Sequence, residues 1–572
     1  PWCWGYLGNR WAIRAPSPSF EFWSACNQGM CGWAPLPGCG ILGAMSSLPR
    51  FDAQALAAMA PDDLRALAAQ LLARIEQDTQ RAEQANQAIA LRDAKIDKLS
   101  FELAQLRRIR FGVKSEQLDA QQRPLFEEAV QADIAALEEE LAELQATPLP
   151  TAAATKRTPR RQPLPFDLPR VAFTHEPEST VCTTPGCGCQ MKRMGEDVSE
   201  KLDYTPGVFT VQRHIRGKWA CTRCQTLIQA PVPAEVIDKG IPTAGLLAQV
   251  LVAKYADHLP LYRQEAIFAR AGFGIARSTL ASWVGVCGVR LHPLVDALKA
   301  ELLDCAVLHA DETPVATLAP GTGKTHRSYL WAYAAGEFET LKAVVYDFTP
   351  SRAGEHARRF LGGWQGSLVC DDFAGYKASF AQGVIEVGCM AHARRKFVEL
   401  HLAKKSHIAA TPLALIGQLY GIERELKEAP PATRLEQRQA QAAPVAAKLH
   451  EWLVLHRIKV PDGTAIAKAI DYSLNRWVAL TRYLADPALP IDNNHDEQQI
   501  RPWATGRKNW LFAGTQLAGQ RAAAVMSLIQ SAKLNGLDPY AYLRDVLTRL
   551  PTHKASRISE LLPHRWASLR AG

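Results

Sequence analysis

The sequence predicts a mixed α/β protein built from several domains. Its 572 residues exceed the roughly 150 residues of one typical domain several times over. Three stretches between about residues 305 and 349 have the length and the β-branched or aromatic content of strands: "CAVLHAD", "SYLWAYAAG" and "LKAVVYDFT". The chain before and after them is rich in Ala, Leu, Gln, Arg and Glu with helical spacing. We therefore expect a strand-bearing centre between helical regions.

The charge balance is mildly basic. The chain has 66 Lys and Arg against 57 Asp and Glu, a net charge of +9. Basic residues cluster in "LRRIRFGVK", "KRTPRR" and "GRKNW", which makes binding to a polyanion plausible. No run of 18 uninterrupted apolar residues occurs, so we expect a soluble protein.

Residues 1–44 differ in texture from the rest of the chain. They hold five of the 14 tryptophans and four of the 13 cysteines and show no periodicity. From Met45 the sequence becomes helix-forming. We expect Met45 to be the natural start and residues 1–44 to be a disordered, non-native upstream extension. A small disulfide module is the alternative.

Residues 45–146 predict a helical or coiled-coil arm. Ile89, Ile96, Leu99, Leu103 and Leu106 fit the a and d positions of heptads. A second helix, "EEAVQADIAALEEELAELQ", follows after a break. A helical hairpin or a dimerising arm is expected, with a solvated helical spacer as the alternative. The prolines and basic residues of 147–170 indicate a linker.

Cysteines mark the next segment, 171–240. Cys182, Cys187 and Cys189 precede the pair Cys221 and Cys224. Four thiolates can enclose one zinc ion and staple a small β-rich module with little core. The Cys-x2-Cys half is a strong signal, whereas Cys189 competes in the irregular first half. Buried free cysteines are the alternative.

Residues 241–300 predict a helix-turn-helix-like region. "PLYRQEAIFARAG", a turn at "FGIA" and "RSTLASWVGVCG" have suitable dimensions, and Ser278 and Thr279 open the second helix. That helix could enter a major groove. A helical hairpin that binds nothing is equally open.

The stretch "LAPGTGKTH" resembles a phosphate-binding loop. Leu318 stands where such a loop needs its first glycine, and a strand follows where it needs a helix. We therefore expect a Gly-containing strand connection and no ATP-driven motor.

Three carboxylates stand out by their context. Asp311 ends "CAVLHAD", Asp371 ends the apolar run "SLVCD", and Glu497 lies in "IDNNHDEQQIRPW", where Asn494 is a natural N-cap. Carboxylates at the edge of a buried sheet need partners, and Mg²⁺ prefers such oxygen ligands. Two Mg²⁺ ions held by three carboxylates can drive an in-line phosphodiester displacement. The alternatives are turn positions for the two aspartates and a capping box between Asn494 and Glu497.

Several motifs closely resemble the insertion-sequence 66 family of DDE transposases. They are "HADETPV", "CDDFAGY", "CMAHARRKF", "IDNNHDEQQIRP", "GRKNWLFAG", "SLIQSAKLNGLDPYAYL", "KYADHLPLYRQE", "RFGVKSEQ" and the cysteine module. The likeness runs from about Met45 to Leu550 in the family's order. It implies an RNase H-like catalytic core over 301–520 and assigns Asp311, Asp371 and Glu497 as catalytic, magnesium-binding residues.

The sequence departs from the family at three places. The family commonly has Asp-Gly at the second carboxylate, whereas Asp371 precedes Asp372, which could substitute for it. Gln498 stands where the family often has Arg. The first zinc knuckle is usually Cys-x2-Cys, so Cys182 is a less secure ligand than Cys187.

Within this frame, residues of about 400–490 form an all-helical insertion before the Glu497 helix, and 521–572 form a C-terminal helical region. Basic and aromatic residues near the carboxylates are expected to contact DNA. The expected DNA-binding residues are His392, Arg394, Arg395, Arg501, Arg507, Lys508, Trp510, Ser278 and Thr279. For the group at 392–395, a solvated basic helix start is the alternative.

The resemblance implies a transposase that binds the ends of its element, cleaves there and transfers the strand to target DNA. Its implied cofactors are two Mg²⁺ ions and one Zn²⁺ ion. We expect a cytoplasmic, nucleoid-associated bacterial protein that forms homo-oligomers through the N-terminal arm and has no membrane partner. Accessory proteins of the same element are a further class of partner that the sequence leaves open. The rival function is a DNA-binding regulator or assembly factor with an inactive core.

Overall fold

The computed structural model describes residues 60–111, 122–145, 164–166, 168–205, 207–238, 240–319, 324–404 and 407–570. The predicted upstream extension 1–44 and most of the predicted linker 147–170 lie outside these ranges. The chain divides into two compact units, Pro1–Ile89 and Ala90–Gly572. In the first unit, the described residues belong to the beginning of a long helix.

Two helices precede the strands. They are α2 (Pro61–Phe111) and α3 (Gln122–Gln145). In the second unit, Leu99 and Leu103 of α2 form an apolar cluster with Val130, Ile134 and Leu137 of α3. The predicted heptad positions in this part of α2 therefore pack against a helix of the same chain, as expected for a hairpin.

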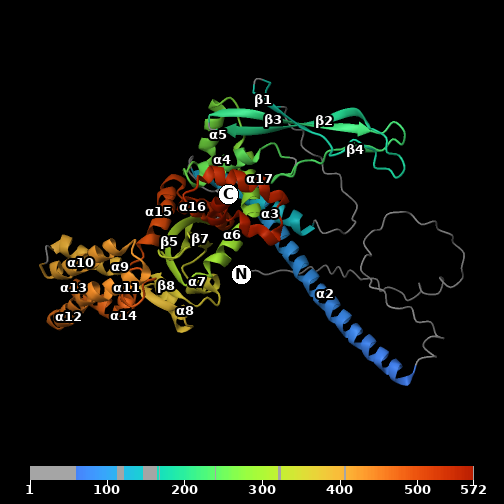
Figure 1. Ribbon diagram of the computed structural model, residues 1–572. Helices are drawn as coiled ribbons and strands as arrows, with labels where there is room; N and C mark the ends of the chain where they lie inside the picture. Colours follow the sequence, from blue (N-terminus) through green and yellow to red (C-terminus); the bar gives the residue numbers. More distant parts are fainter. Residues whose placement is uncertain are drawn as a thin grey trace, which may run out of the picture. The chain divides into compact units, whose positions relative to one another are not determined.

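A small sheet follows, which Figure 1 shows beside α4 and α5. Its strands are β1 (Arg170–His175), β2 (Lys192–Thr205), β3 (Val208–Ala220) and β4 (Leu227–Gln229). The order is β1-β3-β2, and β4 also pairs with β3. Strands β2 and β3 form a long antiparallel hairpin, whereas β1 runs parallel to β3. Cysteines and Met191 form a separate small cluster near its β4 end.

Three helices connect this sheet to the larger one: α4 (Ala244–Tyr255), α5 (Leu261–Arg270) and α6 (Arg277–Leu302). Thr243 caps α4 through its side chain. Helix α6 is packed between α3 and α16. A Cβ atom at Gly285 would collide with the backbone of Ala132 in α3, so this glycine permits the close approach of the two helices.

A five-stranded sheet forms the centre of the second unit. Its strands are β5 (Val307–Ala319), β6 (Lys324–Ala335), β7 (Val344–Thr349), β8 (Ser367–Cys370) and β9 (Ile385–Gly388). The order is β7-β6-β5-β8-β9. β7, β6 and β5 are antiparallel neighbours, and β8 and β9 run parallel to β5. The first three strands thus form a meander, and the other two join it by crossover connections.

One detail corrects the sequence analysis. Asp311 does not end its strand, because β5 continues to Ala319. The residues after Asp311 remain paired with β6, with Asp311 opposite Ala332 and Ala319 opposite Lys324. The predicted strand after "LAPGTGKTH" is confirmed as β6, while residues 320–323 between the strands lie outside the described ranges.

Helices cover both faces of this sheet. Tyr333 stacks on Phe360 of α7 (Gly354–Leu361), with ring centroids 3.7 Å apart. Tyr346, which pairs with Ala332 and so lies on the other face, donates to the Gln499 carbonyl of α15 (Asn494–Trp510) at 2.6 Å. Behind β7 lies α16 (Gln516–Leu534). A 3₁₀ turn (Ala374–Tyr376) and α8 (Lys377–Ala381) follow β8.

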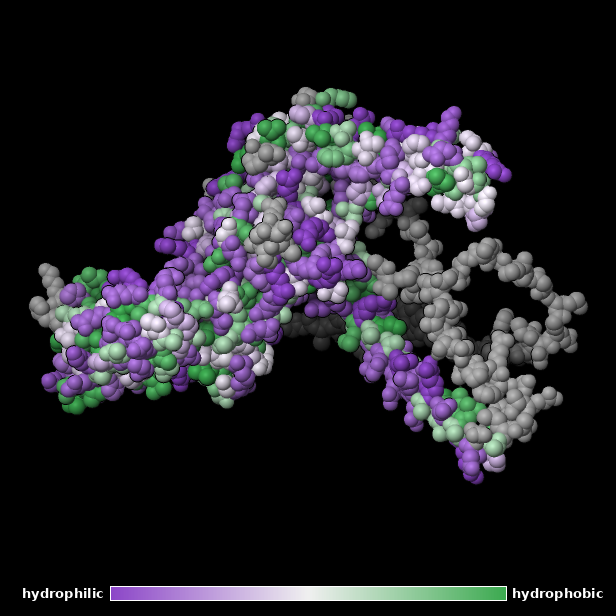
Figure 2. All heavy atoms as spheres, viewed as in Figure 1, coloured by the Kyte–Doolittle hydropathy of each residue, from purple (hydrophilic) through white to green (hydrophobic). Residues whose placement is uncertain are grey.

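A helical insertion lies between β9 and α15. Its helices are α9 (Met390–Lys404), α10 (Ala410–Leu426), α11 (Pro431–Gln437), α12 (Ala443–Lys459), α13 (Ala465–Asn475) and α14 (Trp477–Thr481). Figure 1 shows them gathered beside β8. They share an apolar core that continues onto Val369 and Val387 of the sheet. Figure 2 shows green, apolar atoms on their outer surface, where Val454 and Ile458 are exposed.

The chain ends in α17 (Pro539–Arg549) and α18 (Pro563–Arg570), separated by short 3₁₀ turns. Helix α17 packs against α4. Among the described helices, none combines the length and the apolar character needed to cross a membrane.

Candidate active site and cysteine cluster

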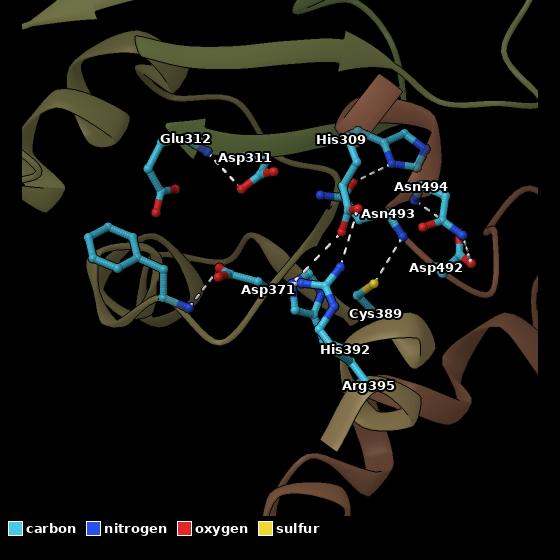
Figure 3. A network of polar contacts seen from close by, with 12 residues as sticks. His309, Asp311, Glu312, Asp371, Cys389, His392, Arg395, Asp492, Asn493 and Asn494 are labelled. Atoms are coloured by element: carbon cyan, nitrogen blue, oxygen red, sulfur yellow. Dashed lines mark hydrogen bonds and ion pairs between the residues drawn. The ribbon is translucent and has the colours of Figure 1, made fainter. Parts of the chain in front are cut away.

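The three predicted carboxylates come from three elements of the central unit. Asp311 lies within β5, Asp371 directly follows β8, and Glu497 lies in the first turn of α15. His309 pairs with Val369 in the parallel register of β5 and β8, so Asp311 and Asp371 lie side by side two residues further on. Figure 3 shows these two residues facing a common space with His392 and Arg395.

The charges of the three groups interact. Burial raises the pKa of Asp311 to about 8, and the negative charges of Glu312, Asp371 and Glu497 add to this effect. A cation among these carboxylate oxygens would relieve their repulsion.

The two adjacent aspartates after β8 have different partners. The Asp371 carboxylate accepts from the backbone N–H of Phe373 at 2.9 Å, which holds it in the turn. The Asp372 carboxylate lies 3.7 Å from Nη1 of Arg476 in the helical insertion. Asp371 is thus the member of the pair that neighbours Asp311.

Glu497 is contacted by two basic residues of α9. Nε2 of His392 lies 3.8 Å from one of its carboxylate oxygens, and Nη2 of Arg395 lies 3.5 Å from the other. Burial and the neighbouring Arg395 lower the pKa of His392. Both distances are longer than those of ordinary hydrogen bonds, so the contacts are electrostatic.

The expected N-cap at Asn494 is wrong, and the alternative reading of Glu497 as part of a capping box is not borne out. The N-cap of α15 is Asn493, and Asn494 is its first helical residue. The Asn494 side chain donates to Asp492 at 2.6 Å, and the backbone N–H of Glu497 donates to the Asn493 carbonyl. The Glu497 side chain is therefore not used in capping.

A buried hydrogen-bond network next to the carboxylates was not predicted from the sequence. Asn493 is fully buried and donates through its side-chain amide to the Ala310 carbonyl at 3.0 Å. Its backbone N–H lies 3.2 Å from the Cys389 sulfur, and its Oδ1 lies 2.7 Å from Nδ1 of His309. Burial lowers the pKa of His309 to about 3, so the ring is neutral. The signal available in the sequence was the polar run "DNN" directly before a helix.

Two further acids near the site were also missed. Glu312 is buried and paired with Arg352, and it accepts from the Tyr376 hydroxyl at 3.2 Å. Asp496 is fully buried, and neither of its carboxylate oxygens has a hydrogen-bond partner within the described part of the chain. Burial raises the pKa of Asp496 well above its usual range.

A cleft of about 350 Å³ opens beside Asp371. It is lined by Arg352, Asp371, Asp372, Phe373, His392, Arg395, Lys396, Glu399 and Tyr472. The spacing of His392, Arg395 and Lys396 puts them on one face of α9. Arg394, which was predicted with them, does not line the cleft. Lys396, which does, was not predicted, because the helix phase could not be set before the start of α9 was known.

The predicted basic residues of α15 divide between two faces. Arg501 and Lys508 are exposed, and their spacing from Glu497 places all three on one side of the helix. Arg507 instead donates to Thr313 Oγ1 at 3.0 Å and to the Pro314 carbonyl. The half-buried ring of Trp510 meets Trp503 edge-on, with centroids 5.8 Å apart.

The first turn of α6 carries the predicted Ser278 and Thr279. Ser278 is exposed and Thr279 is half-buried. Most later residues of α6 are buried in its packing against α3 and α16, including Trp283 and Leu291. Both predicted residues of α6 are therefore accessible to solvent, Ser278 more than Thr279.

Four cysteines converge at one end of the small sheet. The sulfurs of Cys182, Cys187, Cys221 and Cys224 all lie within 4.8 Å of one another. Those of Cys182 and Cys224 are 3.0 Å apart. The fifth cysteine, Cys189, turns its sulfur to the Cys187 carbonyl at 3.4 Å. A compact set of four thiols matches the tetrahedral ligand shell of a structural zinc ion.

Models of known protein families match most of the second unit of this chain. A family model described as "Transposase IS66 family" matches residues 239–521, and its C-terminal element matches residues 527–564. The "zinc-finger binding domain of transposase IS66" matches residues 180–225. A fourth model, "Transposase C of IS166 homeodomain", matches residues 98–172.

The chain belongs to the IS66 transposase family. Similar proteins include two from Sinorhizobium fredii that carry the descriptions "Uncharacterized protein y4qI" and "Uncharacterized protein y4jD". The first is 36% identical over 531 residues, which cover 88% of this chain and 97% of the relative. The second is 37% identical over 423 residues, which cover 72% of this chain and 82% of the relative.

The IS66 matches coincide with the two candidate sites. The transposase match spans all three carboxylates, and the zinc-finger match spans all four clustered cysteines. Family membership and the convergence of the four sulfurs both support zinc in this IS66 protein.

Proposed function

We propose that this IS66-family protein is a DDE transposase. It binds the ends of its insertion sequence, cleaves a phosphodiester there to free a 3′-hydroxyl, and joins that hydroxyl to target DNA. The observation that carries the proposal is the proximity of Asp311, Asp371 and Glu497, which come from a strand, a strand end and a late helix.

The sheet supports an RNase H-like core. A three-stranded antiparallel meander, with two further strands parallel to its first strand, is the strand order that such a core requires. The first carboxylate lies on the first strand and the second follows the fourth. The insertion of six helices before α15 leaves this order intact.

The carboxylates fit magnesium. Asp311 is a buried acid whose pKa is raised partly by neighbouring negative charge, and a cation among these oxygens would relieve that repulsion. Asp311, Asp371 and Glu497 would hold two Mg²⁺ ions. Bound there, the ions would activate water or a 3′-hydroxyl and stabilise the leaving oxygen. The turn at Phe373 keeps Asp371 oriented, and His392 and Arg395 orient Glu497.

Zinc would have a structural role at Cys182, Cys187, Cys221 and Cys224. The small sheet has little apolar core near these residues, so the ion would supply much of the local folding free energy. No open ligand position is needed for such a role.

The DNA contacts follow from exposed basic groups around the carboxylates. Arg501 and Lys508 lie on the same face of α15 as Glu497, and Arg395 lies across the cleft from Asp371. The first turn of α6, with Ser278 and Thr279, is the proposed DNA-reading part of the helix-turn-helix-like region. Because the substrate is chromosomal DNA, we place the protein at the nucleoid in the bacterial cytoplasm.

Self-association is proposed through the first helix. Leu71, Leu72 and Ile75 of α2 are exposed in the described part of the first unit. Apolar residues on a long exposed helix are suited to pairing with a second copy. Two copies would allow both ends of one element to be held together.

The test uses duplex DNA that carries the inverted repeats flanking the coding sequence. Wild-type protein should nick this DNA with Mg²⁺ and not with EDTA. Asp311→Asn, Asp371→Asn and Glu497→Gln should each abolish nicking and leave affinity within about twofold, because they add no bulk. Asp372→Asn is the matched control and should remain active. Binding without cleavage by the wild-type protein would instead favour a DNA-binding regulator with an inactive core.

A further inference from the structure

The cleft beside Asp371 is also lined by a basic residue from outside α9. Arg352, which follows β7, lines this cleft together with Asp371 and Phe373. We propose that Arg352 binds a DNA phosphate adjacent to the scissile one and so fixes the backbone against the carboxylates. This inference rests on the proposed transposase function and adds a residue that neither the sequence motifs nor the family matches assign.

The Arg352 side chain is held in place before any DNA binds. Its Nε lies 2.7 Å from Oε1 of Glu312, and its Nη2 contacts the same oxygen. Its guanidinium group lies 4.0 Å from the centre of the Phe373 ring. The guanidinium group is hydrogen-bonded along one edge and stacked on one face. It therefore loses little further conformational entropy when it binds a ligand.

Glu312, the partner of Arg352, is itself buried and hydrogen-bonded. The Glu312 side chain is 1% exposed, and its second oxygen accepts from the buried Tyr376 hydroxyl. Glu312 directly follows Asp311 on β5, so the same strand fixes the arginine and the first carboxylate. A displacement of Arg352 relative to Asp311 would therefore require the strand to move.

One edge of the guanidinium remains available. The Arg352 side chain is 44% exposed, and its Nη1 has no hydrogen-bond acceptor in the described ranges of the chain. Arginine presents its N–H groups in a planar fork that matches two oxygens of a phosphate. The free edge of the Arg352 guanidinium group is partly exposed to solvent, and its other edge is held by Glu312, so the group is suited to binding a phosphate.

Basic side chains of α9 add to the positive charge that a polyanion requires. Arg395 and Lys396 line the cleft from α9, and Lys396 lies 4.5 Å from the ring centre of Tyr472. Asp371, Asp372 and Glu399 also line the cleft and contribute negative charge. DNA phosphates bridging Arg352 and α9 would bring the backbone across Asp371, where metal ions would screen the repulsion.

The experiment measures binding without added Mg²⁺ and without a chelator, so it does not depend on cleavage and leaves the zinc module intact. Full-length protein is titrated with a labelled duplex from the element's end, in which one methylphosphonate replaces each phosphate in turn around the cleavage position. Arg352→Ala should weaken binding to the unmodified duplex about tenfold. Arg359→Ala is the matched control, because this exposed arginine of α7 does not line the cleft. It should behave as the wild type.

The modified duplexes identify the contact. At one or two positions, the methylphosphonate should weaken wild-type binding about tenfold and leave Arg352→Ala binding unchanged. Equal losses for both proteins at every position would overturn the inference. Arg352→Lys provides a second variant if Arg352→Ala does not fold, and it should retain part of the position-specific loss.

The outcome also separates this inference from the proposed function. Position-specific loss with a wild-type protein that never cleaves would uphold Arg352 as a phosphate contact and refute the enzyme. Cleavage by the wild type, with DNA affinity unchanged in Arg352→Ala, would uphold the enzyme and refute Arg352 as a phosphate contact.

Discussion

Nδ1 of His309 lies 2.7 Å from Oδ1 of Asn493, although the two residues are 184 positions apart in the chain. Because the His309 ring is neutral and Asn493 Oδ1 can only accept, the proton lies on Nδ1. Asn493 also donates to the carbonyl of Ala310, the residue before Asp311. One buried side chain thus ties the strand of the first carboxylate to the helix of the third.

This link predicts the effect of Asn493→Ala. The change leaves the His309 donor and the Ala310 carbonyl unpaired in the interior, at a cost of about 2–3 kcal/mol in the free energy of unfolding. Cleavage should fall by at least tenfold while DNA affinity changes little, because Glu497 loses its register with Asp311. Urea unfolding and a nicking assay measure the two effects. The exposed neighbour Asn494→Ala is the control, and equal behaviour of both variants would contradict this role.

The raised pKa of Asp311 predicts a pH dependence of stability in the metal-free protein. The folded protein keeps this proton to about pH 8, whereas an unfolded chain releases it near pH 4. Between these values the folded state binds more protons, so the free energy of unfolding should fall as the pH rises.

Asp311→Asn should remove this contribution. Without added divalent metal, its melting temperature should fall less between pH 5 and pH 8 than that of the wild type, by about 1 °C for each kcal/mol of repulsion removed in a chain of this length. Added Mg²⁺ should raise the wild-type melting temperature more at pH 8 than at pH 6. Identical pH profiles for the two proteins would show that Asp311 ionises normally.

The cysteine cluster predicts which thiols hold zinc. Protein purified without chelator should contain about one zinc per chain. Cys221→Ser and Cys182→Ser should lower this content strongly, whereas Cys189→Ser should keep it, because the Cys189 sulfur lies outside the group of four. Elemental analysis measures the zinc content of each variant. Loss of zinc from Cys189→Ser would show that Cys182 and Cys187 are assigned incorrectly as the first pair of ligands.

A buried ion pair attaches α3 to the catalytic unit. Asp133 of α3 is fully buried and paired with Arg521 of α16, and Thr515 also donates to it. Asp133→Ala should lower the free energy of unfolding by about 3–5 kcal/mol, because it leaves a buried arginine unpaired. Urea denaturation measures this loss. Glu138→Ala removes a half-exposed partner of Arg107 and should cost less than about 1 kcal/mol.

Local patterns in the sequence predict the elements that carry the site. The apolar run before Asp371 gives β8, and the polar "DNN" run precedes the helix of Glu497. The hairpin reading of "LAPGTGKTH" also holds, because the mismatch at Leu318 and the strand-like residues after it are both local features.

Features that depend on tertiary packing could not be predicted in this way. Nothing near Asn493 in the sequence indicates that it will meet His309, and nothing near Glu312 indicates Arg352 as its partner. The length of β5 beyond Asp311 is likewise set by pairing with β6, since a proline in "ETPVATLA" argues locally against a continued strand.

The helical insertion also has a consequence for the order in which the site is made. It separates Asp371 from Glu497, so a ribosome adds the third carboxylate on the order of ten seconds after the second, at roughly 5–20 residues per second. Helix α16, which supports β7, is translated later still. A nascent chain therefore has an incomplete carboxylate site until α15 has been synthesised, and a chain that stopped before Glu497 would carry two of the three carboxylates on an unfinished fold.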